Sequence, residues 1–202
     1  SLVGQHGVPE DLYQEFMRDI TAEIDRENRI ITDLLTLVKM DKKNADLQIQ
    51  HMSINQLLED ILKRLRPIAD KRNIDLILDS FRPVEADVDE LKFTSAISNL
   101  VENAIKYNVD DGWVRVSLDA DHKFFYVTVA DSGMGIPEDS LSRIFERFYR
   151  VDKSHSREIG GTGLGLAITR STIGMHHGVI KVFSKEGEGT TFSVRVPLSY
   201  IP

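Results

Sequence analysis

Apolar residues between positions 9 and 40 recur at spacings of three and four, which keeps one face of a helix apolar over many turns. The pattern predicts one long helix over residues 9–40. Its seam consists of Met17, Ile20, Ile24, Ile31, Leu34 and Val38. Further apolar positions widen this seam and favour a helical bundle over a two-stranded coiled coil: Leu12, Phe16, Ile30, Leu35 and Leu37. We expect a second copy of the chain or a helix upstream of it to cover this stripe, the alternative being packing on the globular part of the same chain.

Three shorter helices, and a fourth that is very short, follow from the same kind of spacing. Residues 54–68 carry a helical apolar pattern with Ser53 as its N-cap, and residues 91–105 carry another with Asp87 or Asp89 as its N-cap. A third helix is expected over residues 164–175, and a short one after Pro137. Residues 41–50 are polar and break the heptads, which predicts a linker.

Runs rich in β-branched and aromatic residues predict strands between these helices. The expected strands cover residues 74–78, 84–88, 114–118, 123–130, 179–184 and 191–196. The third and fourth should pair antiparallel, and the last two should form a hairpin around a glycine-bearing turn. With about five to seven strands and three substantial helices, the chain is predicted to be α+β, a two-layer α/β sandwich in which helices back a mixed sheet.

Composition narrows the function classes. The chain has 202 residues, 41% of them hydrophobic, which suffices for a folded core. Its net charge of −7 disfavours nucleic acid and anionic membranes as partners. Because there is no cysteine, disulfides and thiolate chemistry are excluded. No run of about 18 apolar residues occurs, so we expect membrane attachment only through segments outside this chain.

Glycines gather between residues 131 and 168, in one cluster after a predicted strand and a second one before a predicted helix. Glycine allows backbone N–H groups to approach a ligand closely, and a helix N-terminus favours anions. A nucleotide is therefore the candidate ligand, with the carboxylate of Asp131 placed to accept a hydrogen bond from a base. The second cluster has neither P-loop nor Rossmann spacing, and each cluster taken alone is also compatible with ordinary turns.

Polar side chains share one face of the helix predicted over residues 91–105 and its continuation. Asn99, Asn103 and Lys106 are four and three residues apart, with Tyr107 beside them. Amide oxygens are suitable ligands for Mg²⁺, and an ammonium group opposes phosphate charge. The alternative for this stripe alone is a solvated helix face.

Five motifs in one order resemble those of sensor histidine kinases, and the resemblance extends over about residues 12–198. They are NLVENAIKY at residues 99–107, DSGMGIP at 131–137, IFERFY at 144–149, GGTGLGLAI at 160–168 and GEGT at 187–190. The resemblance implies the fold shared with gyrase-type ATPases and a requirement for ATP and Mg²⁺. It also implies a lid over the nucleotide formed by residues 150–159.

The resemblance also implies a role for each matching residue. Asp131 would bind the adenine amino group with help from Thr190, Asn103 would hold Mg²⁺, and Lys106 would contact phosphates. Asn99 stands where related hydrolysing ATPases have a glutamate base, which favours transfer over hydrolysis. The expected catalytic residues are thus Asn99, Asn103 and Lys106. The other nucleotide-binding residues would be Tyr107, Gly133, Gly135, Ile136, Gly161, Thr162, Gly163, Leu164, Gly165 and Leu166.

None of the six histidines has the sequence context of the family's phosphoacceptor, and each is expected to be structural or on the surface. By resemblance, residues 1–45 would be part of a dimerisation domain and residues 46–202 the ATP-binding catalytic domain, with the acceptor on an upstream helix. The implied partners are a response regulator and a second copy of the chain, and the implied location is the cytoplasm. A nucleotide-binding regulatory scaffold and an anti-sigma-type serine kinase remain alternatives.

Overall fold

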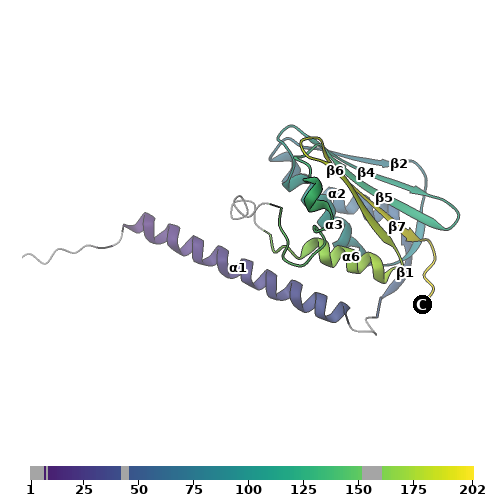
Figure 1. Ribbon diagram of the computed structural model, residues 1–202, viewed down its shortest axis with the longest axis horizontal. Helices are drawn as coiled ribbons and strands as arrows, with labels where there is room; N and C mark the ends of the chain where they lie inside the picture. The colour runs from purple at the N-terminus through teal and green to yellow at the C-terminus, as the bar shows by residue number, and fades with distance from the viewer. Residues whose placement is uncertain (1–6, 8, 42–45, 152–160) are drawn as a thin grey trace, which may run out of the picture.

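A long helix and a helix-backed sheet make up the computed structural model, which describes residue 7 and residues 9–41, 46–151 and 161–202. Helix α1 (Glu10–Met40) projects well beyond the rest of the molecule (Figure 1). It agrees with the predicted helix over residues 9–40. No helix in the described residues combines the length and apolar character needed to cross a membrane.

The main sheet has five strands in the order β2-β4-β5-β7-β6. Strands β2 (Asp75–Ser80) and β4 (Trp113–Ala120) are parallel, whereas β5 (Phe124–Asp131), β7 (Gly189–Pro197) and β6 (Val179–Lys185) continue the sheet antiparallel. The sheet is therefore mixed, as predicted. The predicted antiparallel pair and the terminal hairpin are both confirmed.

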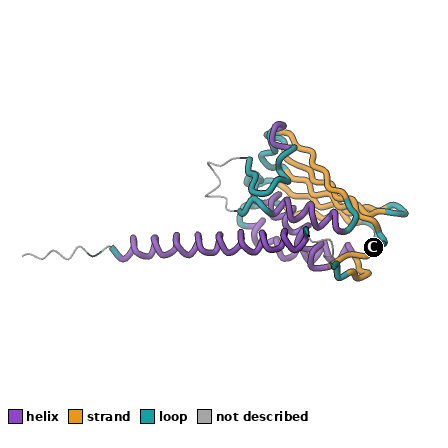
Figure 2. The backbone as a smooth tube through the Cα atoms, turned by 60° about the horizontal axis from the view of Figure 1, so that its bottom comes forward, coloured by secondary structure: helices purple, strands orange, loops and turns teal. Residues whose placement is uncertain are grey.

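Three helices form the second layer, on one face of this sheet (Figure 2). They are α2 (Ile54–Asp70), α3 (Glu90–Lys106) and α6 (Gly165–Met175), and α4 (Glu138–Leu141) is a single turn after Pro137. Both predicted caps are present, because Ser53 Oγ accepts from Gln56 N and Asp89 Oδ1 accepts from Lys92 N. Phe93 of α3 and Phe125 of β5 meet edge to face in the core, with ring centroids 5.7 Å apart.

A small second sheet was not predicted. Strand β1 (Ile49–Ser53) lies at the end of the predicted linker and pairs antiparallel with β3 (Glu85–Asp89). Neither face of β1 is deeply buried, so its sequence is mostly polar and resembles that of a loop. The linker prediction is thus wrong for residues 49 and 50, and residues 42–45 lie outside the described residues.

The apolar stripe of α1 has two environments. Leu37 is fully buried against Leu164 and Ala167 at the start of α6, so the last turns of α1 pack on the globular part of the same chain. Toward the other end, Phe16 and Ile24 are more than half exposed. The interpretation that the chain covers its own stripe therefore holds only for the C-terminal part of α1.

Four histidines lie in the described residues, and none of these four lies within a helix. His176 is buried, accepts from Asp89 N and contacts the carbonyl of Thr172, and burial lowers its pKa. His51 is exposed beside Asp87. These placements, with His122 in a turn and His177 exposed at a helix end, agree with structural or surface roles, while His6 and His155 lie outside the described residues.

Candidate nucleotide site

Helix α3 presents the predicted polar stripe because its apolar residues face the core. Ile97, Leu100 and Val101 are fully buried. Asn99, Asn103 and Lys106 are half-buried on the other face, one turn apart, as helical spacing requires. The stripe is therefore neither a solvated face nor part of the packed core, and its side chains border the loops that carry the glycines.

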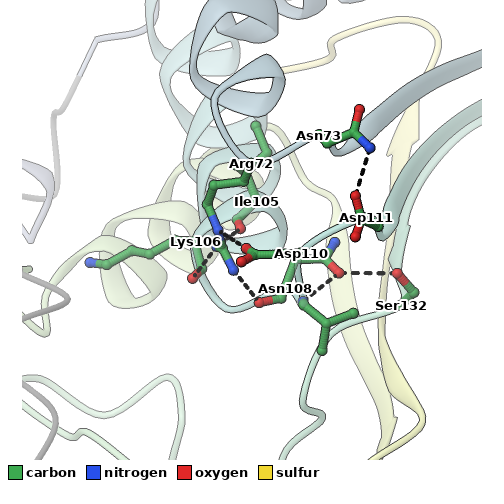
Figure 3. Close-up of polar contacts among 9 residues, drawn as sticks. Arg72, Asn73, Ile105, Lys106, Asn108, Asp110, Asp111 and Ser132 are labelled. Atoms are coloured by element: carbon green, nitrogen blue, oxygen red, sulfur yellow. Dashed lines mark hydrogen bonds and ion pairs between the residues drawn. The ribbon is translucent and has the colours of Figure 1, made fainter.

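The C-terminal end of α3 is held by Arg72, which sequence reasoning missed (Figure 3). The Arg72 guanidinium donates to the carbonyl oxygens of Ile105, Lys106 and Asn108 at 2.8, 3.1 and 2.6 Å, and its Nε donates to Asp110 at 2.8 Å. A cation at this end of a helix also complements the helix dipole. Arg72 thus fixes the turn from which Lys106 and Tyr107 extend.

Asn108 and Ser132 join this turn to the loop after β5, and Figure 3 shows the contact between them. Ser132 Oγ donates to Asn108 Oδ1 at 3.0 Å, and Asn108 Nδ2 donates to the carbonyl of Trp113 at 3.0 Å. Gly133 lies so close that a Cβ atom there would come within 2.5 Å of the carbonyl oxygen of Tyr107. The end of α3 and the first glycine cluster are consequently packed together.

Asp131 ends β5 and faces this junction. Its Oδ1 accepts from Gly133 N at 2.8 Å and from Thr190 N at 3.3 Å. Burial raises the pKa of Asp131 from 3.8 to about 6, against the opposite effect of these two hydrogen bonds. A desolvated carboxylate with one oxygen held by the backbone is suited to recognising a hydrogen-bond donor on a ligand.

The hairpin of β6 and β7 holds the first glycine loop in place. Ile136 N donates to Ser184 Oγ at 2.8 Å, and the Ser184 and Thr190 hydroxyls are 2.8 Å apart. Gly135 has a φ of 71° and lies against the carbonyl of Lys185, where a Cβ atom would clash. Thr190 is therefore placed beside Asp131 as predicted, while the anchoring role of Ser184 was not foreseen.

The second glycine cluster faces α3. A Cβ atom on Gly165 would lie 2.6 Å from Asn99 Oδ1, and one on Gly161 would lie 2.9 Å from Lys106 Nζ. Asn99 Nδ2 donates to Thr169 Oγ1 at 3.0 Å, one turn into α6. Two of the predicted catalytic residues, Asn99 and Lys106, therefore meet two of the predicted nucleotide-binding glycines.

The remaining residues of the second cluster have structural contacts of their own. Thr162 Oγ1 donates to Asp33 of α1 at 2.7 Å, and Leu164 is fully buried. Gly163, with a φ of 74°, accepts from Phe148 N at 2.9 Å. Leu166, like Ile136 of the first loop, packs against the main core.

Cations converge at this end of α3. The pKa of Lys106 is lowered by burial and by the positive charges of Arg150 and of Arg29 on α1. Lys106 Nζ also lies 5.4 Å from the ring centroid of Tyr107. The positive electrostatic potential that lowers the pKa of Lys106 also attracts a polyanion. Of the predicted lid, residues 152–159 lie outside the described residues.

The fold and the site together define the class of protein. Residues 88–200 match the family described as histidine kinase-, DNA gyrase B- and HSP90-like ATPases. These residues are more than half of the chain, so the chain belongs to this family.

Relatives within the family confirm the resemblance to sensor histidine kinases. Sensor histidine kinase WalK of Bacillus subtilis (strain 168) is 34% identical over 190 residues, which are 93% of this chain and 31% of WalK. RppB, a sensor histidine kinase of Synechocystis sp., is 36% identical over 178 residues, which are 88% of this chain and 39% of RppB. The chain thus spans less than half the length of these relatives.

A solved catalytic domain has the same fold. The catalytic domain of histidine kinase ThkA superposes with a TM-score of 0.67 at 26% identity, covering 76% of this chain and 97% of the ThkA domain.

Proposed function

We propose that this chain is the ATP-binding part of a sensor histidine kinase, which transfers the γ-phosphoryl group of Mg-ATP to a histidine outside residues 1–202. One observation carries the proposal: Asn99 and Lys106 of α3 lie against Gly165 and Gly161. An amide, an ammonium and the backbone N–H groups at the start of α6 are thereby brought to one place.

The residues present fit a magnesium-bound nucleoside triphosphate. Asp131 would accept from the adenine amino group, with the Thr190 hydroxyl beside it, and Tyr107 would line the pocket. Asn103 offers an amide oxygen to Mg²⁺, and Lys106 offers positive charge to the phosphates. Bound Mg²⁺ neutralises phosphate charge and positions phosphate oxygens.

The chain's own contribution is positioning and electrostatic stabilisation. Arg72 fixes the backbone at the end of α3, Thr169 orients the side chain of Asn99, and Lys106 would stabilise negative charge as it spreads over the transferred group. Asn99 is a poor general base because an amide does not accept a proton from water. We therefore infer that transfer is favoured over hydrolysis.

Replacing Asn103 with alanine tests the metal assignment. Calorimetric titration with Mg-ATP should show a loss of affinity of at least about tenfold, whereas titration with ATP in excess chelator should change little. Asn28→Ala, on the exposed face of α1, is the matched control. Wild-type affinity of Asn103→Ala for Mg-ATP would remove Asn103 from the metal site.

Phosphotransfer to a separately supplied dimerisation helix that carries a histidine tests the activity. A kinase should produce phosphohistidine, which is stable in base and lost in acid. Binding of ATP without transfer would favour the regulatory scaffold. An acid-stable phosphoserine on a partner would favour the anti-sigma-type serine kinase.

Dimerisation through α1 and transfer to a response regulator belong to the same proposal, as does a cytoplasmic location. The exposed residues of α1 support dimerisation, because Leu12, Phe16 and Ile31 are each more than half exposed. Phe16→Glu should shift a dimer to a monomer in analytical ultracentrifugation. A wild-type chain that sediments as a monomer at high concentration would contradict this part.

A further inference from the structure

A groove of about 560 Å³ runs along strand β6, and none of its lining residues belongs to the nucleotide site described above. Residues 178–183 line it. Leu141 at the end of α4, Phe145, and Arg170 and Gly174 of α6 also line it. A Cβ atom on Gly174 would meet no other atom within 4 Å, so the α6 side of the groove is open.

Strand β6 is an edge of the five-stranded sheet. Within the described ranges it pairs on one side only, with β7. The first glycine loop covers its C-terminal end, where Ile136 N donates to Ser184 Oγ and Gly187 N donates to the carbonyl of Met134. Residues 179–183 are therefore the open part of this edge, and alternate N–H and C=O groups of such a strand point away from the sheet.

The two faces of this open strand differ. Lys181 and Phe183 lie on the outer face, opposite Ser193 and Thr191 of β7, and Phe183 is 62% exposed. Ile180 and Val182 lie on the inner face and pack against the main core. Because side chains alternate along a strand, an added strand would place every second side chain in the groove and the others beside Lys181 and Phe183.

Charge indicates what kind of strand fits. Arg170 is exposed and its guanidinium lies 5.5 Å from the ring centroid of Phe145, and Lys181 is exposed on the edge itself. No carboxylate of the described residues forms an ion pair with either side chain. An edge lysine disfavours pairing with a second copy of the same edge, since like charges would meet. It favours an acidic segment, although the whole chain carries a net charge of −7.

We propose that the open edge of β6 is a docking site for an extended acidic segment of another protein, which adds a strand to the sheet and places apolar side chains in the groove. Main-chain hydrogen bonds would supply affinity, and the groove with its two cations would supply specificity. The proposal does not depend on the proposed kinase activity, because neither the groove nor the edge involves the nucleotide site.

A peptide titration tests the proposal on the full 202-residue chain. The probe is a fluorescein-labelled ten-residue peptide in which glutamate alternates with valine, and its counterpart has lysine in place of every glutamate. Fluorescence anisotropy should show binding of the acidic peptide and at least about tenfold weaker binding of the basic one. Amide hydrogen exchange should slow at residues 179–183 and not in β2, the opposite edge.

Charge reversal locates the contact. Lys181→Glu and Arg170→Glu should each weaken the acidic peptide several-fold, whereas Lys63→Glu on the exposed face of α2 makes the same charge change away from β6 and should have no effect. Thermal unfolding of each variant checks that it is folded. Equal binding of both peptides, no binding at all, or binding without protection of residues 179–183 overturns the proposal. Concentration-dependent protection of these residues without peptide would identify a second copy as the occupant and overturn the charge argument.

Discussion

Replacing Asp131 with asparagine is expected to stabilise the free protein while weakening its binding of an adenine nucleotide. Asp131 is half-buried, and its desolvation raises its pKa from 3.8 to about 6. At neutral pH the folded protein therefore holds an ionised carboxylate in an unfavourable environment. Asparagine retains an oxygen for the N–H groups of Gly133 and Thr190 and removes the charge.

The size of the gain follows from linkage. A pKa difference of about 2 units between the folded and unfolded chain corresponds to about 3 kcal/mol, and contact with solvent reduces the expected gain at pH 7.5 to about 1–2 kcal/mol. Because the folded-state pKa is raised, this cost is absent below about pH 4 and grows as pH rises through 6. The gain at pH 5 should therefore be about half of that at pH 7.5.

Urea unfolding of wild type and Asp131→Asn at both pH values measures this gain, with Asp75→Asn, an exposed carboxylate at the start of β2, as the control. In the variant, an amide NH₂ replaces the second carboxylate oxygen. Two hydrogen-bond donors, this NH₂ and the adenine amino group, would then face each other. ATP affinity should fall at least about tenfold in calorimetry. Lower stability of Asp131→Asn at pH 7.5 would refute the desolvation argument, and unchanged ATP affinity would refute the role of the carboxylate in reading the base.

Three other predictions follow from the same geometry. The ratio of ATP affinity to inosine triphosphate affinity should fall about tenfold between pH 7.5 and 5, because protonation of Asp131 removes an acceptor for the 6-amino group of adenine. Titration of the phosphates affects both nucleotides equally and therefore cancels in the ratio. A constant ratio would contradict this prediction. Thr169→Val should weaken Mg-ATP binding severalfold in calorimetry, because valine lacks the hydroxyl that accepts a hydrogen bond from Asn99. Thr169→Ser keeps that hydroxyl and should bind Mg-ATP normally. Weaker binding by Thr169→Ser than by Thr169→Val would indicate that Thr169 has a packing role alone. Arg72→Met should lower the free energy of unfolding by about 2–3 kcal/mol in urea titrations. Asp110→Asn keeps the contacts of Arg72 with the carbonyl groups and should lower it by less than about 1 kcal/mol. Equal losses would show that the ion pair with Asp110 accounts for the effect.

The elements could be predicted from the sequence because each depends on neighbouring residues. Ser53 and Asp89 cap helices through hydrogen bonds to residues three positions away. The β6–β7 hairpin likewise closes over a short glycine turn. Polar strand β1 was missed because its pairing partners, such as Asp87 for His51, lie 36 positions away and its own pattern does not identify them.

The supports of the site could not be predicted for a related reason. Arg72 reaches the carbonyl of Ile105, 33 residues later, and nothing near Arg72 in the sequence distinguishes it from other surface arginines. Leu37 is one of many apolar residues in the stripe of α1, yet it alone among the described residues of that helix is fully buried, against Leu164. Such contacts depend on where α1, α3 and α6 meet in space.

The glycines of the two clusters and of the β6–β7 turn have two different structural roles. Gly135 and Gly189, with φ angles of 71° and 108°, lie against backbone atoms of Lys185 and Asp131, so larger residues there would disturb the loop whether or not a ligand is bound. Gly165 instead leaves space beside the side chain of Asn99 on the stripe proposed to bind Mg-ATP. From the sequence, Gly135 and Gly165 were both expected to bind the nucleotide, and Gly189 was expected only as part of a hairpin turn. In the structure, Gly135 and Gly189 shape the loop that carries Asp131, whereas Gly165 leaves room for the side chain of Asn99.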